Sequence, residues 1–163
     1  MTINLKEILE LQRELDFNIE TKHNINKDDV VNKKKLAFIV ELCEMINVNR
    51  CFKFWSVKNN YDREKLGDEF VDCLHFILSL SLYYKMEKTE FNILENNYDK
   101  DQLTDKILDL IKASTNINDA HDCEVIIIKL FELCKTFGFT WKDIIDFYKK
   151  KNDINHQRQK DNY

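Results

Sequence analysis

A chain of 163 residues is long enough for one domain with an extensive apolar core. It contains no proline and only two glycines, whereas turn-rich β folds usually need more of both, so the composition favours an all-α domain. A formal net charge of −4 without any basic block argues against nucleic acid as the main partner. No apolar run reaches transmembrane length and no signal-peptide pattern is present, so we expect no membrane contact and a soluble, cytoplasmic protein.

Apolar residues recur at helical spacing and predict about six helices in a single domain over residues 1–163. The helices are expected at about 5–21, 29–47, 68–86, 102–113 and 123–136, with a sixth that follows Thr140 and runs into the polar tail. Gly138 should end the fifth helix in a left-handed conformation, and Thr140 with Asp143 should cap the sixth. The segment 87–120 is interpreted as a variable or inserted segment.

Two pairs of acidic residues lie inside otherwise apolar helical runs. Glu41 and Glu44 are three residues apart, as are Glu69 and Asp72, and this spacing places each pair on one helix face. If the second and third helices pack antiparallel, the four carboxylates converge, and buried without partners each would cost several kcal/mol. A hard cation such as Mg²⁺ would hold such an all-oxygen cluster. Two solvated acidic faces remain the alternative.

A polyphosphate bound to such a metal also needs basic side chains to balance its remaining negative charge. Arg50 and Lys53 follow the first acidic pair closely. In the tail, Lys151, Asn155 and Arg158 fall at i, i+4 and i+7, so they share one face if the last helix continues that far. A frayed, solvated C-terminus is the alternative interpretation of the tail.

Gln12 stands in the apolar stripe of the first helix, four residues after Ile8 and three before Leu15. A buried amide needs hydrogen-bond partners. It can hydrogen-bond to a planar edge such as that of a nucleobase, or it can serve the structure alone.

Four stretches together resemble the all-α, dimeric dUTPases of the phage, bacterial and trypanosomatid type, within the MazG-like nucleoside-triphosphate pyrophosphatase superfamily. They are ELCE (41–44), FKFWS (52–56), DEFVDCLHF (68–76) and KKKNDINHQRQ (149–159). The opening LQRELDFNI (11–19) is similar to the first motif of that family. The resemblance runs from about residue 5 to the end and is weakest from 87 to 120. It implies a helical bundle of the all-α pyrophosphatase type that forms a homodimer.

The resemblance also implies a reaction, the Mg²⁺-dependent hydrolysis of dUTP to dUMP and pyrophosphate by attack of water at the α-phosphorus. The implied Mg²⁺ ligands are Glu41, Glu44, Glu69 and Asp72, and Glu44 would also orient or deprotonate the water. The implied phosphate-binding residues are Lys53, Lys151 and Arg158. Gln12 and Asn155 would contact the uracil edge, Trp55 would line the base pocket, and Phe76 would pack against the deoxyribose.

Two other functions remain open at this point. A related pyrophosphatase for dCTP or a modified nucleotide would differ only in base recognition, for which Gln12 and Asn155 are the sole indicators. A helical regulatory module without catalysis would belong to another class, although a binding scaffold has no need of four inward carboxylates. In phage members of the family an inserted region near 87–120 can engage other proteins, so a regulatory protein partner also stays open.

Overall fold

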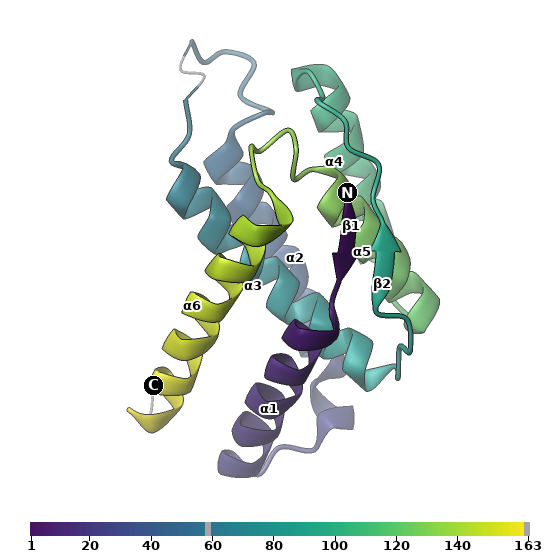
Figure 1. The fold of residues 1–163 in the computed structure, drawn as a ribbon, viewed down its shortest axis with the longest axis vertical. Coiled ribbons are helices and arrows are strands. Elements are labelled where there is room, and N and C mark those ends of the chain that lie inside the picture. Colours follow the sequence, from purple (N-terminus) through teal and green to yellow (C-terminus); the bar gives the residue numbers. More distant parts are fainter. Residues whose placement is uncertain (58–59, 162–163) are drawn as a thin grey trace.

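A computed structural model describes residues 1–57 and 60–161, and this part of the chain is mostly helical with very little sheet (Figure 1). In chain order its elements are β1 (Thr2–Asn4), α1 (Lys6–Lys22), α2 (Lys27–Asn49), α3 (Arg63–Tyr83), β2 (Glu90–Asn92), α4 (Lys100–Ser114), α5 (Ala120–Glu132) and α6 (Trp141–Lys160). The predicted all-α class with six helices is therefore confirmed. Among these helices none combines the length and the apolarity needed to cross a membrane.

Local capping explains where the helices begin and end. α3 starts at Arg63, five residues before the expected start, because the Asp62 side chain accepts a hydrogen bond from the Lys65 N–H. Gly138 has φ +74°, so its predicted left-handed conformation is confirmed, and the Phe139 N–H donates to the Cys134 carbonyl. It does not end the fifth helix as predicted, because α5 already ends at Glu132 with a right-handed cap at Leu133, and Gly138 closes the turns that follow. The predicted cap of α6 is also confirmed, since Thr140 and Asp143 form a reciprocal capping box.

Helix α3 occupies the centre of the bundle, in contact with α1, α2, α5 and α6. Most of its residues are buried, among them Leu66, Phe70, Leu74 and Ile77. Its longest partner is α2, which buries Phe38, Leu42 and Met45. Helices α1 and α6 lie side by side over another face of α3 (Figure 1). The residues that α2 and α3 turn toward α1 and α6 therefore face a space bounded by four helices.

Residues 87–120 are packed into the same core as the rest of the described chain. β2 pairs antiparallel with β1, with Ile3 opposite Phe91, and both side chains are buried. α4 packs against α5 and α2 and buries Leu103, Ile107 and Leu110. The sequence pattern did not predict the two strands, because three residues are too few for an alternating apolar pattern to stand out.

Gly67 allows α6 to approach α3 closely. A Cβ atom added at Gly67 would lie 2.5 Å from Cε2 and Cζ of Phe147, a distance that atoms in folded proteins do not adopt. The Phe147 ring is 7% exposed and packs edge-on against Phe139 at 5.7 Å between centroids, so it has little room to move away. Because Lys151 follows Phe147 by one helical turn, this contact also determines how closely the basic face of α6 approaches α3.

We predict that Gly67→Ala lowers the free energy of unfolding. Overpacking costs about 1–3 kcal/mol, which exceeds the roughly 1 kcal/mol that alanine gains over glycine within a helix. Urea denaturation of the variant measures the loss. In a Phe147→Leu background the clash is relieved, so the same Gly67→Ala change should become neutral or stabilising. An equal loss in both backgrounds would show that Phe147 is not the group that requires glycine.

Candidate active site

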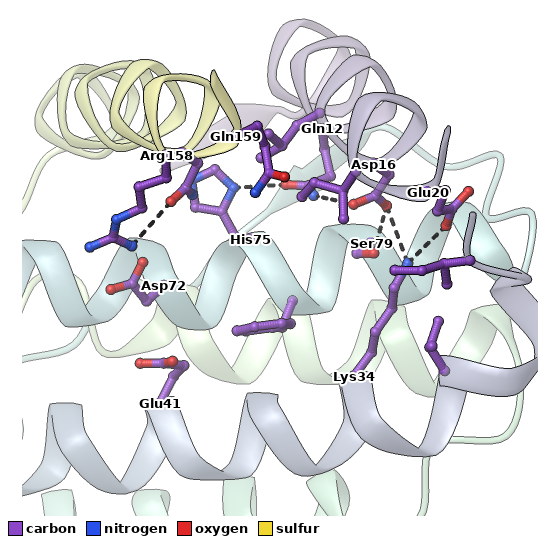
Figure 2. Close-up of a pocket in the computed structure, with 16 residues that line it drawn as sticks. Gln12, Asp16, Glu20, Lys34, Glu41, Asp72, His75, Ser79, Arg158 and Gln159 are labelled. Atoms are coloured by element: carbon purple, nitrogen blue, oxygen red, sulfur yellow. Dashed lines mark hydrogen bonds and ion pairs between the residues drawn. The ribbon is translucent and has the colours of Figure 1, made fainter. Parts of the chain in front are cut away.

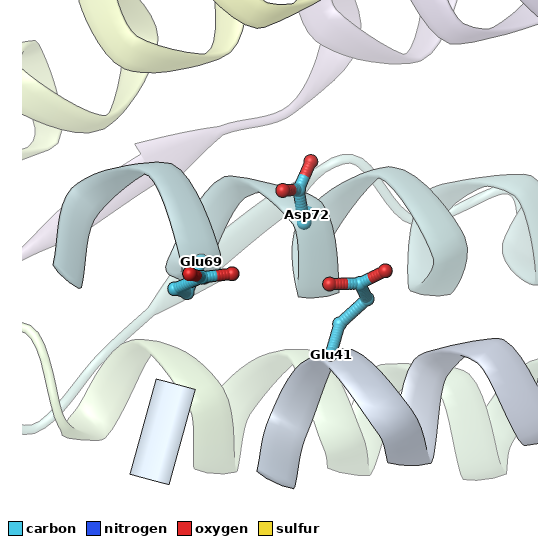
Figure 3. Close-up of side chains that lie close together, drawn as sticks. All are labelled: Glu41, Glu69 and Asp72. Carbon is cyan, nitrogen blue, oxygen red and sulfur yellow. The ribbon is translucent and has the colours of Figure 1, made fainter. Parts of the chain in front are cut away.

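Three carboxylates from α2 and α3 converge on one point (Figure 3). Glu41 comes from α2, while Glu69 and Asp72 come from successive turns of α3. One oxygen of each lies within 4.8 Å of the others, and all three residues are half-buried. The side chains next to them in sequence, Leu42, Phe70 and Val71, are fully buried, so apolar packing holds the acidic groups at the junction of the two helices.

Glu44 lies beside this cluster rather than in it. It follows Glu41 by one turn of α2, and its side chain is exposed. Its negative charge nevertheless contributes to the raised pKa of both Glu41 and Glu69. The structure thus brings three of the four predicted metal ligands together and places the fourth at their margin.

The cluster favours a bound positive charge. Burial, followed by the charges of Asp72, Glu44 and Glu69, raises the pKa of Glu41 to about 7. Burial is also the largest cause of the raised pKa of Glu69 and Asp72. Each carboxylate is therefore stabilised when it binds a proton or a cation. Because the donors are oxygens only and lie close enough to share one ion, they fit a hard divalent cation such as Mg²⁺.

The basic face of α6 approaches the cluster from the opposite side. Because α6 is helical as far as Lys160, Lys151, Asn155 and Arg158 share the face that the sequence predicted, and the tail is not frayed within the described residues. The Lys151 ammonium donates a hydrogen bond to Asp72 and forms an ion pair with it. The positive charge of Arg158 also favours the ionised form of Asp72. Arg158 Nη1 donates a hydrogen bond to Asn155 Oδ1 at 3.4 Å.

A cavity of about 350 Å³ opens beside these charges, between α1, α2, α3 and α6 (Figure 2). Glu41, Asp72 and Arg158 lie at one end, while Gln12, Asp16 and Ser79 lie toward the other. The remaining lining residues include the apolar side chains Leu15, Ile19, Ile25, Val30 and Phe76. Predicted site residues that line the cavity are Gln12, Glu41, Asp72, Phe76, Asn155 and Arg158. The end with Glu41, Asp72 and Arg158 suits phosphates. The other compartment combines the apolar side chains with the ion pairs of Lys34 to Asp16 and Glu20, and it has room for a nucleoside.

Of the predicted residues that do not line the cavity, Glu44, Glu69 and Lys151 lie in or beside the carboxylate cluster, whereas two others lie apart from it. Lys53 and Trp55 belong to the loop that follows α2, and the Lys53 ammonium donates to the Asn47 side chain over 3.0 Å. Trp55 is 65% exposed and packs edge-on against Phe52 and Phe54. Among the described residues of a single chain, neither side chain lines the cavity, and their predicted contacts with phosphate and base stay predictions.

A buried hydrogen-bond network surrounds Gln12, which is only 3% exposed. Its Oε1 accepts from the Tyr148 hydroxyl at 2.7 Å and from His75 Nδ1 at 2.8 Å, and its Nε2 donates to Asp16 at 2.8 Å. The sequence pattern singles out Gln12 but neither Asp16 nor Tyr148. Asp16 could have been predicted from its position one helical turn after Gln12. Tyr148 could not, because it lies on α6, far from Gln12 in the sequence.

Comparison with known proteins identifies the family of the chain. A family model described as dUTPase matches residues 4–163, which is nearly the whole chain. No curated protein matches the sequence. Enzymes of this kind generally use a divalent metal ion, as the carboxylate cluster would require. The resemblance drawn from the motifs is thus confirmed: the chain belongs to the all-α dimeric dUTPase family and is a dUTP diphosphatase, a hydrolase acting on nucleoside triphosphates.

Proposed function

We propose that this enzyme uses Mg²⁺ to hydrolyse dUTP to dUMP and pyrophosphate, with water attacking the α-phosphorus. The observation that supports this mechanism best is the convergence of Glu41, Glu69 and Asp72 at the charged end of the cavity. In this proposal the triphosphate binds beside the carboxylates and the nucleoside binds between α1 and α6.

The acidic residues have two roles in this proposal. Glu41, Glu69 and Asp72, joined by Glu44, hold the metal. When bound, Mg²⁺ would neutralise the carboxylates and polarise phosphate oxygens. Glu44 is exposed at the margin of the cluster. It can therefore orient the attacking water and accept its proton, while the bond between the α-phosphorus and the bridging oxygen breaks and pyrophosphate leaves.

Cations balance the charge of the triphosphate. Lys151 and Arg158 lie beside Asp72, so phosphate oxygens held by them would lie next to the metal site. We also assign Lys53 to phosphate binding, although it lies outside the cavity of a single chain. Positioning and charge neutralisation account for most of what phosphoryl transfer requires from a protein.

The nucleoside occupies the opposite compartment. Gln12 and Asn155 are assigned to the edge of the base, Phe76 to the face of the deoxyribose, and Trp55 to the outer wall. Phe76 lies one turn after Asp72 on α3 and lines the cavity, which would place it between the metal site and the base. An apolar ring there leaves a 2′-hydroxyl without a hydrogen-bond partner, which disfavours ribonucleotides.

A panel of nucleoside triphosphates assayed with Mg²⁺ tests the substrate. We expect dUTP to be cleaved in preference to dCTP, dTTP and UTP, with dUMP and pyrophosphate as products. A preference for dCTP would favour the related pyrophosphatase, and the absence of both turnover and Mg²⁺ binding would favour a regulatory module.

Within the same panel, Glu44→Gln should abolish pyrophosphate release and keep the fold. Glu64→Gln, in the exposed first turn of α3, serves as the matched control.

The raised pKa of Glu41 predicts a pH-dependent metal affinity. This carboxyl titrates at about 7 in the folded protein instead of 4.5, so below pH 7 it carries a proton that an incoming cation must displace. Mg²⁺ affinity should therefore fall by about tenfold per pH unit below 7 and level off above it. Calorimetric titration of metal-free protein with MgCl₂ at pH 6, 7 and 8 measures this slope. Glu41→Gln should bind more weakly and lose the slope; an affinity independent of pH in wild type would contradict the assignment.

We further propose that the enzyme is a homodimer joined through α2. Leu36 and Val40 are one turn apart on this helix and are 62% and 45% exposed, so they form an apolar strip on its outer face. Replacing both with Glu should convert the dimer to a monomer in analytical ultracentrifugation, because a buried interface tolerates unpaired charges poorly. Leu108→Glu, at an exposed apolar position on α4, is the control that should leave the dimer intact. A monomeric wild-type protein at micromolar concentration would refute this proposal.

A further inference from the structure

The Gln12 amide is held from both ends by hydrogen bonds, its oxygen by Tyr148 and His75 and its nitrogen by Asp16. Its oxygen lies 2.7 Å from the Tyr148 hydroxyl and 2.8 Å from His75 Nδ1. An amide oxygen can only accept, so Nδ1 must carry a hydrogen. Burial lowers the pKa of His75 to about 3, so the ring is neutral and its other nitrogen, Nε2, carries none. This tautomer fits the surroundings, since Nε2 is buried without a partner among the described residues.

Asp16 determines the position of the amide nitrogen. Its carboxylate accepts hydrogen bonds from Gln12 Nε2, at 2.8 Å, and from the Ser79 hydroxyl. The same carboxylate lies 3.7 Å from the Lys34 ammonium. Burial raises the pKa of Asp16, whereas the Lys34 charge and the two hydrogen bonds favour the ionised form, which can only accept. Turning the Gln12 amide over would set its oxygen against this carboxylate, and neither group would have a hydrogen to donate.

One hydrogen of the fixed amide is left for the cavity. Gln12 Nε2 carries two hydrogens, and the described residues provide a partner only for the one directed at Asp16. Its oxygen already accepts two hydrogen bonds, so it has no capacity left for a ligand. Because Gln12 lines the cavity, a base placed there meets a donor and no acceptor from this residue.

We propose that Asp16, His75 and Tyr148 are positioning residues that fix the Gln12 amide so that its free N–H selects a pyrimidine with a carbonyl oxygen at position 4 over one with an amino group. This inference rests on the proposed function of the cavity and adds the origin of its base preference. A 4-amino group is a donor, so it would face the Gln12 N–H with neither partner satisfied. A site built around one buried donor rejects such a ligand strongly, because both groups lose their hydrogen bonds to water.

Tyr148→Phe tests the inference with little change of shape. The ring still stacks on His75, at 4.2 Å between centroids, and only the donor to Gln12 is removed. We expect the ratio of kcat/KM for dUTP over dCTP to fall by about tenfold, mostly through KM, with kcat for dUTP kept within about twofold. Tyr84→Phe is the matched control, since its hydroxyl bonds to the Ile117 carbonyl outside this cavity, and it should keep the wild-type ratio.

Asp16→Asn tests the opposite end of the same amide. An asparagine can donate as well as accept, so it permits Gln12 to turn over, and His75 can shift its hydrogen to the unpartnered Nε2. We expect a larger fall of the dUTP to dCTP ratio than in Tyr148→Phe. Glu20→Gln is the control, because Glu20 forms an ion pair with the same Lys34 at 3.2 Å. This variant removes the same charge as Asp16→Asn but leaves the hydrogen bonds of Gln12 unchanged. It should retain the preference of the wild type for dUTP over dCTP.

Calorimetric binding of dUMP and dCMP to metal-free protein separates this inference from the catalytic proposal. Preferential binding of dUMP by wild type, lost in Tyr148→Phe and Asp16→Asn, supports the inference whether or not the enzyme turns over dUTP. Unchanged preference in both variants, with folds verified by circular dichroism, overturns it and leaves the hydrolase mechanism standing. A wild-type protein that binds neither nucleotide overturns both.

Discussion

The repulsion among carboxylates from two adjacent helices is the constraint on which the site depends. Glu41, Glu69 and Asp72 would separate if they were free to do so, and burial raises the pKa of each. The apolar packing of α2 against α3 prevents this, because their buried neighbours belong to the main core. Core stability therefore maintains an electrostatically unfavourable arrangement, which becomes favourable only when a proton or a cation is shared. Such stored repulsion is typical of a preorganised metal site.

Compensating charge arrives from α6, at the far end of the sequence. Lys151 reaches Asp72 because α6 approaches α3 closely, and that approach depends on Gly67, two residues before Glu69. A single glycine thus couples helix packing to the electrostatics of the cavity. The same helix contributes Tyr148, which reaches Gln12 on α1. The docking of α6 therefore completes both ends of the cavity at once.

The sequence predicted the parts of the site that follow helical periodicity. Glu41 lies with Glu69 and Asp72 because the faces that carry them meet where α2 packs against α3, and Arg158 joins them because α6 stays helical. The same spacing did not bring Glu44 into the cluster, because it is exposed one turn further along α2. Trp55 shows the limit of this reasoning. It lies in a loop, where no periodicity fixes the direction of a side chain, and the structure exposes it outside the cavity. The strands β1 and β2 were missed for a related reason, since three residues carry too little pattern.

Hydrogen-bond polarity is the property least accessible from sequence. The position of Gln12 in an apolar stripe predicts that its amide is buried, but not which end of the amide faces a ligand. That direction depends on a carboxylate one turn along α1, an imidazole on α3 and a phenol on α6, three groups that no single spacing relates. Metal chemistry and base selection thus have different physical origins in this fold. The first arises from like charges held together, whereas the second arises from donors and acceptors that leave the amide one permitted orientation.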